Sequence, residues 1–321
     1  MRAARVTKLG NPDVIEILEL PDPVPGPEQV LVRVDYAGVN FIDVYHRTGL
    51  YPQPLPFGLG EEGAGVVIGV GPMVGIDPGT RVAWVHGGGS YATHAVIPAA
   101  SAVPIPDGIE TEQAAALMLQ GMTAHYLSRS TFRLAHGHVC VVHAAAGGVG
   151  LLLTQLARGA GARVIGVVST EAKADAARAA GCELVVKSGA DLVAAVKEAT
   201  DGRGADVVYD SVGNDTFEQS LDALAPRGML VLYGQSSGPV PPIDLQLLSR
   251  KGSLYATRPT LRHYTQTRAE LLNRAHELFT QIVDGSLKLT IDRTLPLDHA
   301  PDAHRLLESR ATSGKLLLDC R

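Results

Sequence analysis

The chain has 321 residues, which is long enough for two domains that each bury a substantial hydrophobic core. Hydrophobic residues make up 45% and charged residues 19%, a balance typical of a soluble globular protein. The formal net charge of −5 argues against a nucleic-acid partner, which would require a basic surface.

Targeting and redox signals indicate an ordinary intracellular chain. Residues 1–8 are not followed by an apolar stretch, so we expect no signal peptide. The apolar run 139–157 is broken by a Gly-Gly-Val-Gly turn, so we expect no membrane span and no membrane partner. Cys140, Cys182 and Cys320 lie far apart without metal-ligand spacing, which predicts a reducing, cytoplasmic location.

The first hundred residues are rich in predicted strands. Runs such as 30–36 and 64–70 alternate with Pro/Gly turns such as 21–27, which predicts a small barrel or sandwich. A helix is expected to follow from Thr111, its predicted N-cap, to about residue 130.

From about residue 138 the pattern changes to alternating strands and helices, which predicts a parallel sheet covered on both faces. The predicted strands are 138–142, 163–168, 183–187, 205–210 and 228–233, and the predicted helices are 149–160, 171–180, 191–200 and 214–224. The tail is predicted to form a helix at 268–284, a strand near 289–295, a helix at 299–309 and a last strand from residue 316. Because this tail is too short to bury its own apolar faces, we expect it to pack on the β-rich part.

Residues 139–161 form the most informative stretch of the chain. A buried strand leads into the turn Ala144-Ala-Ala-Gly-Gly-Val-Gly150, which opens an apolar helix. Small residues let the backbone approach a pyrophosphate, and the helix N-terminus offers free N–H groups to the anion. The strand at 163–168 completes a βαβ unit, so we favour dinucleotide binding over a purely structural turn.

The end of the second strand favours NADP(H) over NAD(H). NAD-selective folds place Asp or Glu at this strand tip, where it binds the ribose 2′-hydroxyl. Here the strand ends in Ser169-Thr170, Glu171 comes later in the predicted helix, and Lys173 follows closely. Ser169 and Lys173 are able to bind a 2′-phosphate; the alternative is that Ser169 caps the helix and Lys173 is solvated.

Eight segments in the same order along the whole chain resemble the zinc-independent quinone oxidoreductases of the medium-chain dehydrogenase/reductase superfamily, the group that includes zeta-crystallin. They are GVNFIDVY (38–45), RTGLY (47–51), GEEGAG (60–65), HAAAGGVG (143–150), VYDSVG (208–213), GQSSG (234–238), TRP (257–259) and ESRAT (308–312). The resemblance implies an α/β fold. A Rossmann domain with a doubly wound parallel sheet, expected at 124–261, is inserted into a β-rich GroES-like catalytic domain, expected at 1–123 and 262–321.

Zinc is not expected. Zinc-dependent relatives carry Cys at the position of Asn40, His-Glu at Glu61-Glu62, and a lobe of four closely spaced cysteines, none of which this chain has. Its histidines show no ligand spacing and are predicted to be packing or surface residues. Without a metal to acidify an alcohol, reduction of an electron-poor acceptor is the easier chemistry.

The resemblance also implies the coenzyme contacts, with the pyrophosphate on the N–H groups of residues 147–149. The matching positions are Phe41, Thr123, Ala145, Ala146, Gly147, Gly148, Val149, Gly150, Ser169, Lys173, Ser188, Ser211, Gly234, Gln235, Ser236 and Arg310. Two of them depart from the family pattern. Ser188 stands where the family often has Tyr, with Lys187 as a candidate substitute, and Gln235 replaces Asn in the nicotinamide loop.

For the acceptor, the resemblance implies Asn40, Asp43, Tyr45, Tyr51 and Arg258. Asn40 is suited to donate a hydrogen bond to a quinone oxygen, or it caps a turn. Tyr45 and Tyr51 offer flat faces and hydroxyl donors, although Tyr51 also fits ordinary loop packing. Asp43 is expected to orient the loop or the coenzyme, and Arg258 to stabilise a developing oxyanion.

The implied activity is direct hydride transfer from NADPH to a quinone. The alternatives are an NADPH-dependent enoyl or alkenal reductase acting on a conjugated enone, and a non-catalytic protein that only binds NADPH. The resemblance also implies a homodimer, with residues 251–256 as the candidate edge strand for pairing across the dimer axis.

Overall fold

The computed structural model describes residues 1–321, which fold into two compact units. Unit 1 comprises Met1–Met122 and Thr265–Arg321, and unit 2 comprises Thr123–Tyr264. The tail after residue 264 therefore belongs to the same unit as the first 122 residues.

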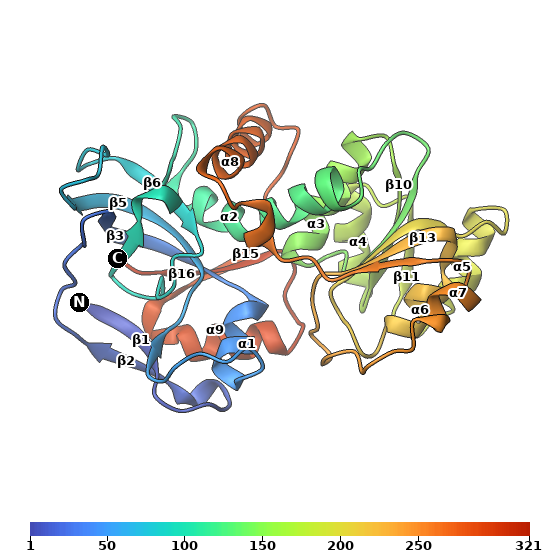
Figure 1. The fold of residues 1–321 in the computed structure, drawn as a ribbon, viewed down its shortest axis with the longest axis horizontal. Helices are drawn as coiled ribbons and strands as arrows, with labels where there is room; N and C mark the ends of the chain where they lie inside the picture. Colours follow the sequence, from blue (N-terminus) through green and yellow to red (C-terminus); the bar gives the residue numbers. More distant parts are fainter. The chain divides into compact units, whose positions relative to one another are not determined.

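Unit 1 is built on two sheets (Figure 1). The small sheet has the strand order β2-β1-β4, and the large sheet the order β15-β16-β3-β5-β6-β8, with β7 paired to β3. The strands are β1 Arg2–Val6, β2 Ile15–Glu19, β3 Gln29–Val39, β4 Phe57–Gly58, β5 Glu62–Val70, β6 Arg81–Val85, β7 His94–Pro98, β8 Val103–Pro104, β15 Ile291–Pro296 and β16 Lys315–Asp319. The C-terminal strand β16 pairs antiparallel with β3, which fixes the tail onto the N-terminal sheet.

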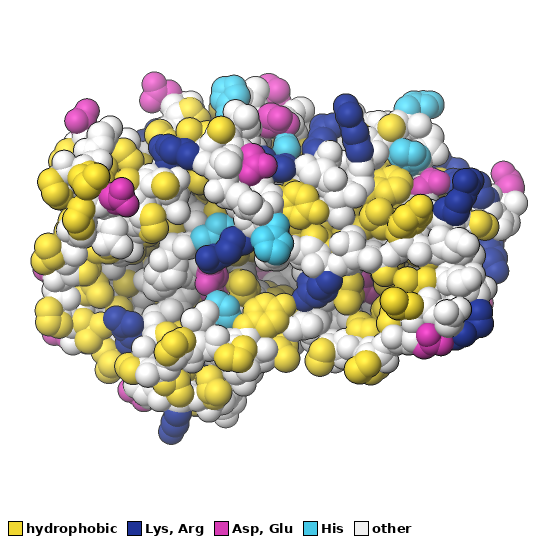
Figure 2. Space-filling view, in the orientation of Figure 1, with side chains coloured by type: hydrophobic (Ala, Val, Ile, Leu, Met, Phe, Trp, Pro, Cys, Tyr) yellow, Lys and Arg dark blue, Asp and Glu magenta, His cyan; other side chains and the backbone are white.

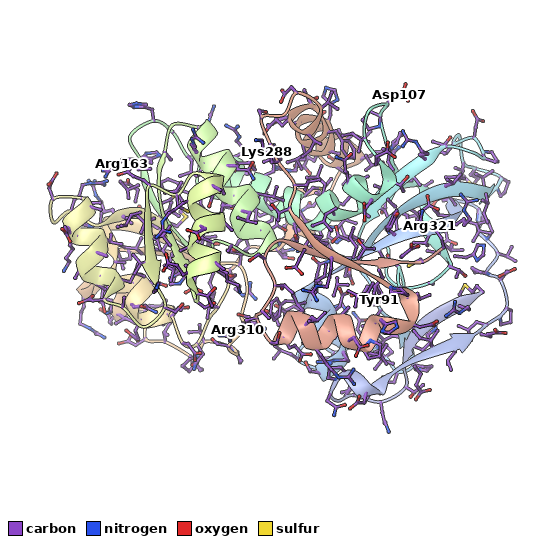
Figure 3. All side chains as sticks on the ribbon, turned by 180° about the vertical axis from the view of Figure 1, so that it is seen from behind. Tyr91, Asp107, Arg163, Lys288, Arg310 and Arg321 are labelled. Carbon is purple, nitrogen blue, oxygen red and sulfur yellow. The ribbon has the colours of Figure 1, made fainter.

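Helices close the sheets of unit 1. They are α1 Phe41–Thr48, α8 Arg268–Val283 and α9 Ala300–Glu308, with short 3₁₀ turns at η1 Pro12–Val14, η2 Ala99–Ser101 and η5 Leu297–His299. A fourth 3₁₀ turn, η4 Leu261–Tyr264, belongs to unit 2. β3 buries Val30, Val32 and Val34 because alternate residues of a strand face the same side. Arg310 follows the end of α9 (Figure 3).

Unit 2 is a six-stranded parallel sheet with the order β11-β10-β9-β12-β13-β14. Its strands are β9 Val139–His143, β10 Arg163–Val168, β11 Leu184–Lys187, β12 Ala205–Asp210, β13 Leu224–Leu232 and β14 Tyr255–Thr257. Its helices are α3 Gly148–Gly159, α4 Glu171–Ala180, α5 Leu192–Ala199, α6 Phe217–Asp222 and α7 Gln246–Arg250. This strand order reverses between β9 and β12, which is where open α/β sheets bind dinucleotides.

Helices cover both faces of this sheet. Val141 and Ile165 share a core cluster with Leu192 of α5 and Phe217 of α6. Gly166, the next residue of β10, faces the other side and meets Ala145 and Cys182. Successive side chains of these strands point to opposite faces of the sheet, and helices cover both faces. The strands are therefore apolar at nearly every position in the sequence.

The structure corrects several predicted bounds. Thr111 is the first residue of α2 (Thr111–Tyr126) and not its cap, and a π-helical turn, η3 Leu127–Thr131, follows α2. The helix predicted at 214–224 is confined to 217–222, because residue 224 already starts β13. α7 was not predicted from the sequence.

The surface shown in Figure 2 mixes Lys and Arg with Asp and Glu, among scattered apolar side chains. None of the helices is both long and apolar enough to cross a membrane.

Candidate functional site: a dinucleotide turn and two buried polar networks

The turn between β9 and α3 leaves helix N–H groups without partners. Ala145 N–H donates to Val167 O at 3.1 Å, and Gly147 N–H donates to Ala144 O at 2.8 Å. Gly147 is the N-cap of α3 and has no side chain to cap it, and no acceptor reaches the N–H groups of Gly148 and Val149. Of the three N–H groups predicted to bind the pyrophosphate, that of Gly147 is already engaged, while those of Gly148 and Val149 are not.

Gly150 keeps α3 close to this turn. A Cβ atom built on Gly150 would lie 2.3 Å from Ala144 O and 2.8 Å from the Cα atom of Ala145. Both contacts are with backbone, which cannot move aside as a flexible side chain would. A side chain at position 150 would therefore force the start of α3 away from the turn.

A buried hydrogen-bond network lies next to the turn. It consists of His143, Asp210, Thr216 and Ser220, and we call it the Asp210 network. Ser220 Oγ is 3.0 Å from Nε2 of His143 and donates to Oδ2 of Asp210 at 2.8 Å. Thr216 Oγ1 donates to the same oxygen at 2.7 Å. Burial lowers the pKa of His143, and the nearby Asp210 opposes that shift. Ser220, His143 and Asp210 resemble a hydrolytic triad in composition, but all three are buried, so they bind one another and no substrate.

The Asp210 network also holds the loops that carry the predicted nicotinamide contacts. Asp210 Oδ1 accepts from the N–H groups of Val212 at 2.8 Å and Gly213 at 3.0 Å. The loop that follows β13 is bonded to this segment, with Ser236 N–H donating to Ser211 O and Ser237 N–H to Val212 O. Gly234 is packed so closely that a Cβ atom there would lie 2.6 Å from Ser211 O.

Gln235 belongs to the same loop, and its carbonyl accepts from Gly238 N–H at 2.9 Å. The structure therefore brings Ser211, Gly234, Gln235 and Ser236 together. Because His143, the last residue of β9, belongs to the Asp210 network, these residues are also linked to the strand that leads into the glycine turn. The sequence analysis did not identify Asp210 and Ser220 as residues that support these loops. A carboxylate at the end of β12, Asp210, is the sequence feature that could have indicated this role.

The residues predicted to bind the 2′-phosphate, Ser169 and Lys173, follow β10, and Ser188, predicted to lie near the adenosine, follows β11. Thr170 is the N-cap of α4, and its side chain accepts from Lys173 N–H at 3.4 Å. The alternative that Ser169 caps this helix is therefore wrong. Ser188 N–H donates to Val168 O at 2.8 Å, which places it at the same sheet edge. Arg310, which the family resemblance also implies for the 2′-phosphate, belongs to unit 1, and this contact stays a prediction.

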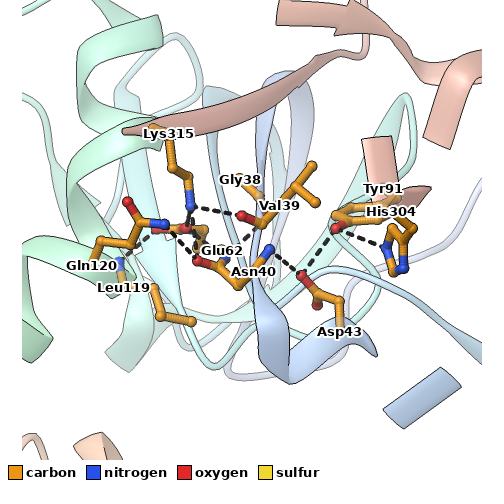
Figure 4. Close-up of polar contacts among 10 residues, drawn as sticks. All are labelled: Gly38, Val39, Asn40, Asp43, Glu62, Tyr91, Leu119, Gln120, His304 and Lys315. Atoms are coloured by element: carbon orange, nitrogen blue, oxygen red, sulfur yellow. Dashed lines mark hydrogen bonds and ion pairs between the residues drawn. The ribbon is translucent and has the colours of Figure 1, made fainter. Parts of the chain in front are cut away.

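In unit 1, Asn40 lies in a second network that includes a buried ion pair (Figure 4). Lys315 and Glu62, 2% and 0% exposed, form the pair. Asn40 Nδ2 donates to Glu62 Oε1 at 2.7 Å and to Gly38 O at 3.2 Å, and Asn40 Oδ1 accepts from Lys315 Nζ at 2.9 Å. Both amide hydrogens of Asn40 are therefore engaged within the protein, and donation to a quinone and turn capping both stay predictions.

Asp43 supports the same turn from inside the first turn of α1 (Figure 4). Its Oδ2 accepts from the N–H of Asn40 and from the hydroxyl of Tyr91, both at 2.9 Å, while Oδ1 has no partner. Burial raises the pKa of Asp43 to about 7, and Glu61 adds to the rise. The Tyr91 hydroxyl also lies 3.4 Å from Nε2 of His304, whose pKa burial lowers to about 3. This geometry fits the expected orienting role of Asp43.

The aromatic residues on and after α1 form one group. Tyr45 meets Tyr51 edge-to-face at 5.2 Å between ring centroids, and Phe41 lies 6.2 Å from Tyr45. Tyr45 is buried and Tyr51 half-buried, so Tyr51 is the more accessible residue of the two.

In unit 2, Arg258 is exposed at the end of β14 and donates to Leu232 O at 3.0 Å. Near it lies an aromatic pair missed from the sequence, Tyr126 stacked on Tyr264 at 4.3 Å. Burial raises the pKa of Tyr126, and Arg258 opposes the rise. Thr123 is buried in α2, one turn before Tyr126.

The residues present do not fit a zinc ion. No group of three or more His, Cys, Asp or Glu side chains is placed to hold a metal ion. Asn40 and Glu62 are bonded to each other and to Lys315, and all three cysteines are free and buried.

Two family models match the chain: an alcohol dehydrogenase GroES-like domain at residues 26–107 and a zinc-binding dehydrogenase domain at residues 148–277. The β-rich unit and the parallel-sheet unit together thus define a medium-chain dehydrogenase/reductase. Quinone oxidoreductase of Pseudomonas aeruginosa is 47% identical over 96% of both chains. The 2-haloacrylate reductase of a Burkholderia species is 41% identical over 98% of both.

A solved structure extends the comparison. Escherichia coli quinone oxidoreductase complexed with NADPH superposes with a TM-score of 0.97 at 44% identity, covering 99% of this chain and 100% of that one. The protein belongs to the quinone oxidoreductase family and is an oxidoreductase enzyme.

Proposed function

We propose that the protein reduces quinones with NADPH, by direct hydride transfer and without zinc. The observation that carries the proposal is the uncapped N-terminus of α3, where the N–H groups of Gly148 and Val149 have no acceptor. A diphosphate supplies the negative charge that such a helix end favours. NADPH, when bound, supplies a hydride from C4 of its reduced nicotinamide.

The chain's own residues hold the reactants. The loop 234–236, fixed through Ser211 to the Asp210 network, would contact the nicotinamide, and Ser169, Lys173 and Ser188 the adenosine end. Tyr51 would face a planar acceptor, and Arg258 would stabilise the oxyanion. With Asn40 engaged by Glu62 and Gly38, the proton that completes the hydroquinone comes from water.

Mixing the purified protein with NADPH and a panel of quinones tests the proposal by loss of nicotinamide absorbance. We expect turnover on at least one quinone, undiminished by a chelator. Absence of turnover on every quinone and enone would leave only NADPH binding, the non-catalytic alternative. A stoichiometric catalytic metal would contradict the zinc-free reaction.

One observation favours a second candidate activity. The Burkholderia relative is named for reduction of a haloacrylate, whose conjugated C=C bond accepts a hydride much as a quinone does. We therefore include 2-alkenals and haloacrylates in the panel. A faster rate on these than on any quinone would assign the chain to C=C reduction.

We further propose that the protein is a cytoplasmic homodimer. All three cysteines are free and buried, which suits a reducing compartment. β14 is the edge strand of the parallel sheet and exposes Tyr255, which favours pairing with a second copy. Of the candidate segment 251–256, only residues 255 and 256 lie in β14. Lys251 is engaged with Asp222, and strand structure begins only at Tyr255.

A further inference from the structure

Glu171 is the first carboxylate after the strand tip at which NAD-selective folds carry theirs. Glu171 opens α4, three residues beyond the end of β10 and about 20 residues after the glycine turn. A carboxylate within reach of the adenosine ribose accepts hydrogen bonds from its hydroxyl groups and repels a 2′-phosphate. Taken alone, Glu171 therefore disfavours NADPH.

Both oxygens of this carboxylate are already engaged. Oε2 of Glu171 lies 2.6 Å from Nζ of Lys187, and Oε1 accepts from Nη1 of Arg178 at 3.1 Å. Arg178 also binds Asp175 at 2.9 Å. The Lys187 and Arg178 contacts lower the pKa of Glu171, which is the direction expected for a carboxylate paired with two cations.

The sheet register brings Lys187 to this position. β10 and β11 run parallel with Val168 beside Lys187, so both strands end at the same edge. Ser188 N–H donates to Val168 O at 2.8 Å, which fixes that register immediately beyond the strand ends. The paired side chains of Glu171 and Lys187 are 57% and 55% exposed and so lie open to a bound coenzyme.

We propose that Lys187, with Arg178, sets the coenzyme preference of this chain by neutralising Glu171. The formal charges of Glu171, Asp175, Arg178 and Lys187 cancel, and Lys173 adds one positive charge to the same helix. Without Lys187 the net charge of this cluster falls by one unit, and Oε2 of Glu171 becomes available to a ribose hydroxyl. This inference rests on the proposed binding of NADPH and names Lys187 and Arg178 as specificity-determining residues.

Calorimetric dissociation constants for NADPH and NADH test the proposal without any acceptor. Lys187→Met should shift the preference about tenfold toward NADH, the size expected for one unit charge near a phosphate at a partly solvated site. Glu171→Gln combined with Lys187→Met should return the preference to within about twofold of the parent, because the charge that required neutralising is gone.

The chain offers a matched control at the opposite ends of the same two strands. Arg163, at the start of β10, binds Glu183 just before β11 at 2.6 Å, with similar exposure. Arg163→Met should leave the preference unchanged. An unchanged preference in Lys187→Met would overturn the inference. So would an equal loss of NADPH affinity in the single and double variants, which would mean that Lys187 contacts the phosphate directly. If the parent protein binds neither coenzyme, the proposed function itself fails.

Discussion

Lys315 is the cation of the buried ion pair in unit 1. Its ammonium group has three donors, and Glu62, Asn40 and Val39 accept all of them. Lys315→Met would leave the Glu62 carboxylate buried without its counter-ion. We expect the free energy of unfolding to fall by about 3–5 kcal/mol, measured by urea denaturation.

Two further variants distinguish the loss of stability caused by breaking the ion pair from the effect of replacing any surface lysine. Lys288, exposed beyond α8 and labelled in Figure 3, gives the control Lys288→Met, which should change stability by less than about 0.5 kcal/mol. Replacing both partners, Glu62→Met with Lys315→Met, should recover part of the loss because no buried charge remains. A double variant less stable than Lys315→Met would contradict this reasoning.

Asp43 predicts a pH dependence of stability. Its folded pKa, about 7, lies above the ordinary value of 3.8, so between these values the folded chain holds a proton that the unfolded chain has released. Raising the pH through this window therefore favours unfolding, by about 1.4 kcal/mol per pH unit for one such group. The contribution is complete below about pH 4 and lost above about pH 7.

Asp43→Asn removes this titration while keeping an oxygen that can accept from Asn40 and Tyr91. Urea midpoints of the parent and the variant, measured from pH 4 to pH 8, should diverge as the pH rises, with the variant gaining relative stability. Parallel curves would show that Asp43 is already ionised in the folded protein at low pH.

At the scale of an element, α3 contains a matched pair of glycines. Gly150→Ala forces a Cβ atom to within 2.3 Å of Ala144 O, so we expect a loss of about 1–3 kcal/mol and NADPH binding weakened at least about tenfold. Gly159, at the other end of α3, has nothing within 4 Å of its Cβ position. Gly159→Ala should raise stability by about 0.5–1 kcal/mol and leave NADPH binding unchanged. Thermal denaturation and coenzyme titration of the two variants check both expectations. Equal effects at both glycines would rule out the packing argument.

The elements of unit 2 were predictable where periodicity was strong. β10 and α4 match their predicted ranges, because a buried strand and a capped helix each leave a local signal. The short helix α7 and the π-helical turn after α2 were not foreseen. Their conformations depend on packing between segments and not on a repeating pattern within them.

At the scale of the whole molecule, the limits of sequence reasoning follow from distance along the chain. The glycine turn is local and could be recognised, whereas Lys315 contacts Glu62 across a separation of 253 residues. The role predicted for Asn40 came from the family resemblance, and the structure shows its amide engaged by Gly38 and Glu62, the second of which no spacing rule connects to it. Hydrogen-bond networks between residues far apart in the sequence can therefore be identified only once the fold is known.

The proposed dimer gives the last prediction. Tyr255 is 59% exposed on β14, which pairs only with β13, so the outer edge of this strand is available to a second copy. Tyr255→Glu would place a charge on each side of a two-fold axis, where the two charges repel. Sedimentation equilibrium should show a dimer for the parent and a shift toward monomer for this variant. Met73→Glu is the control, since Met73 is 70% exposed in unit 1, and it should keep the dimer mass. A monomeric parent protein would contradict the dimer. An unchanged dimer in Tyr255→Glu would move the interface away from β14.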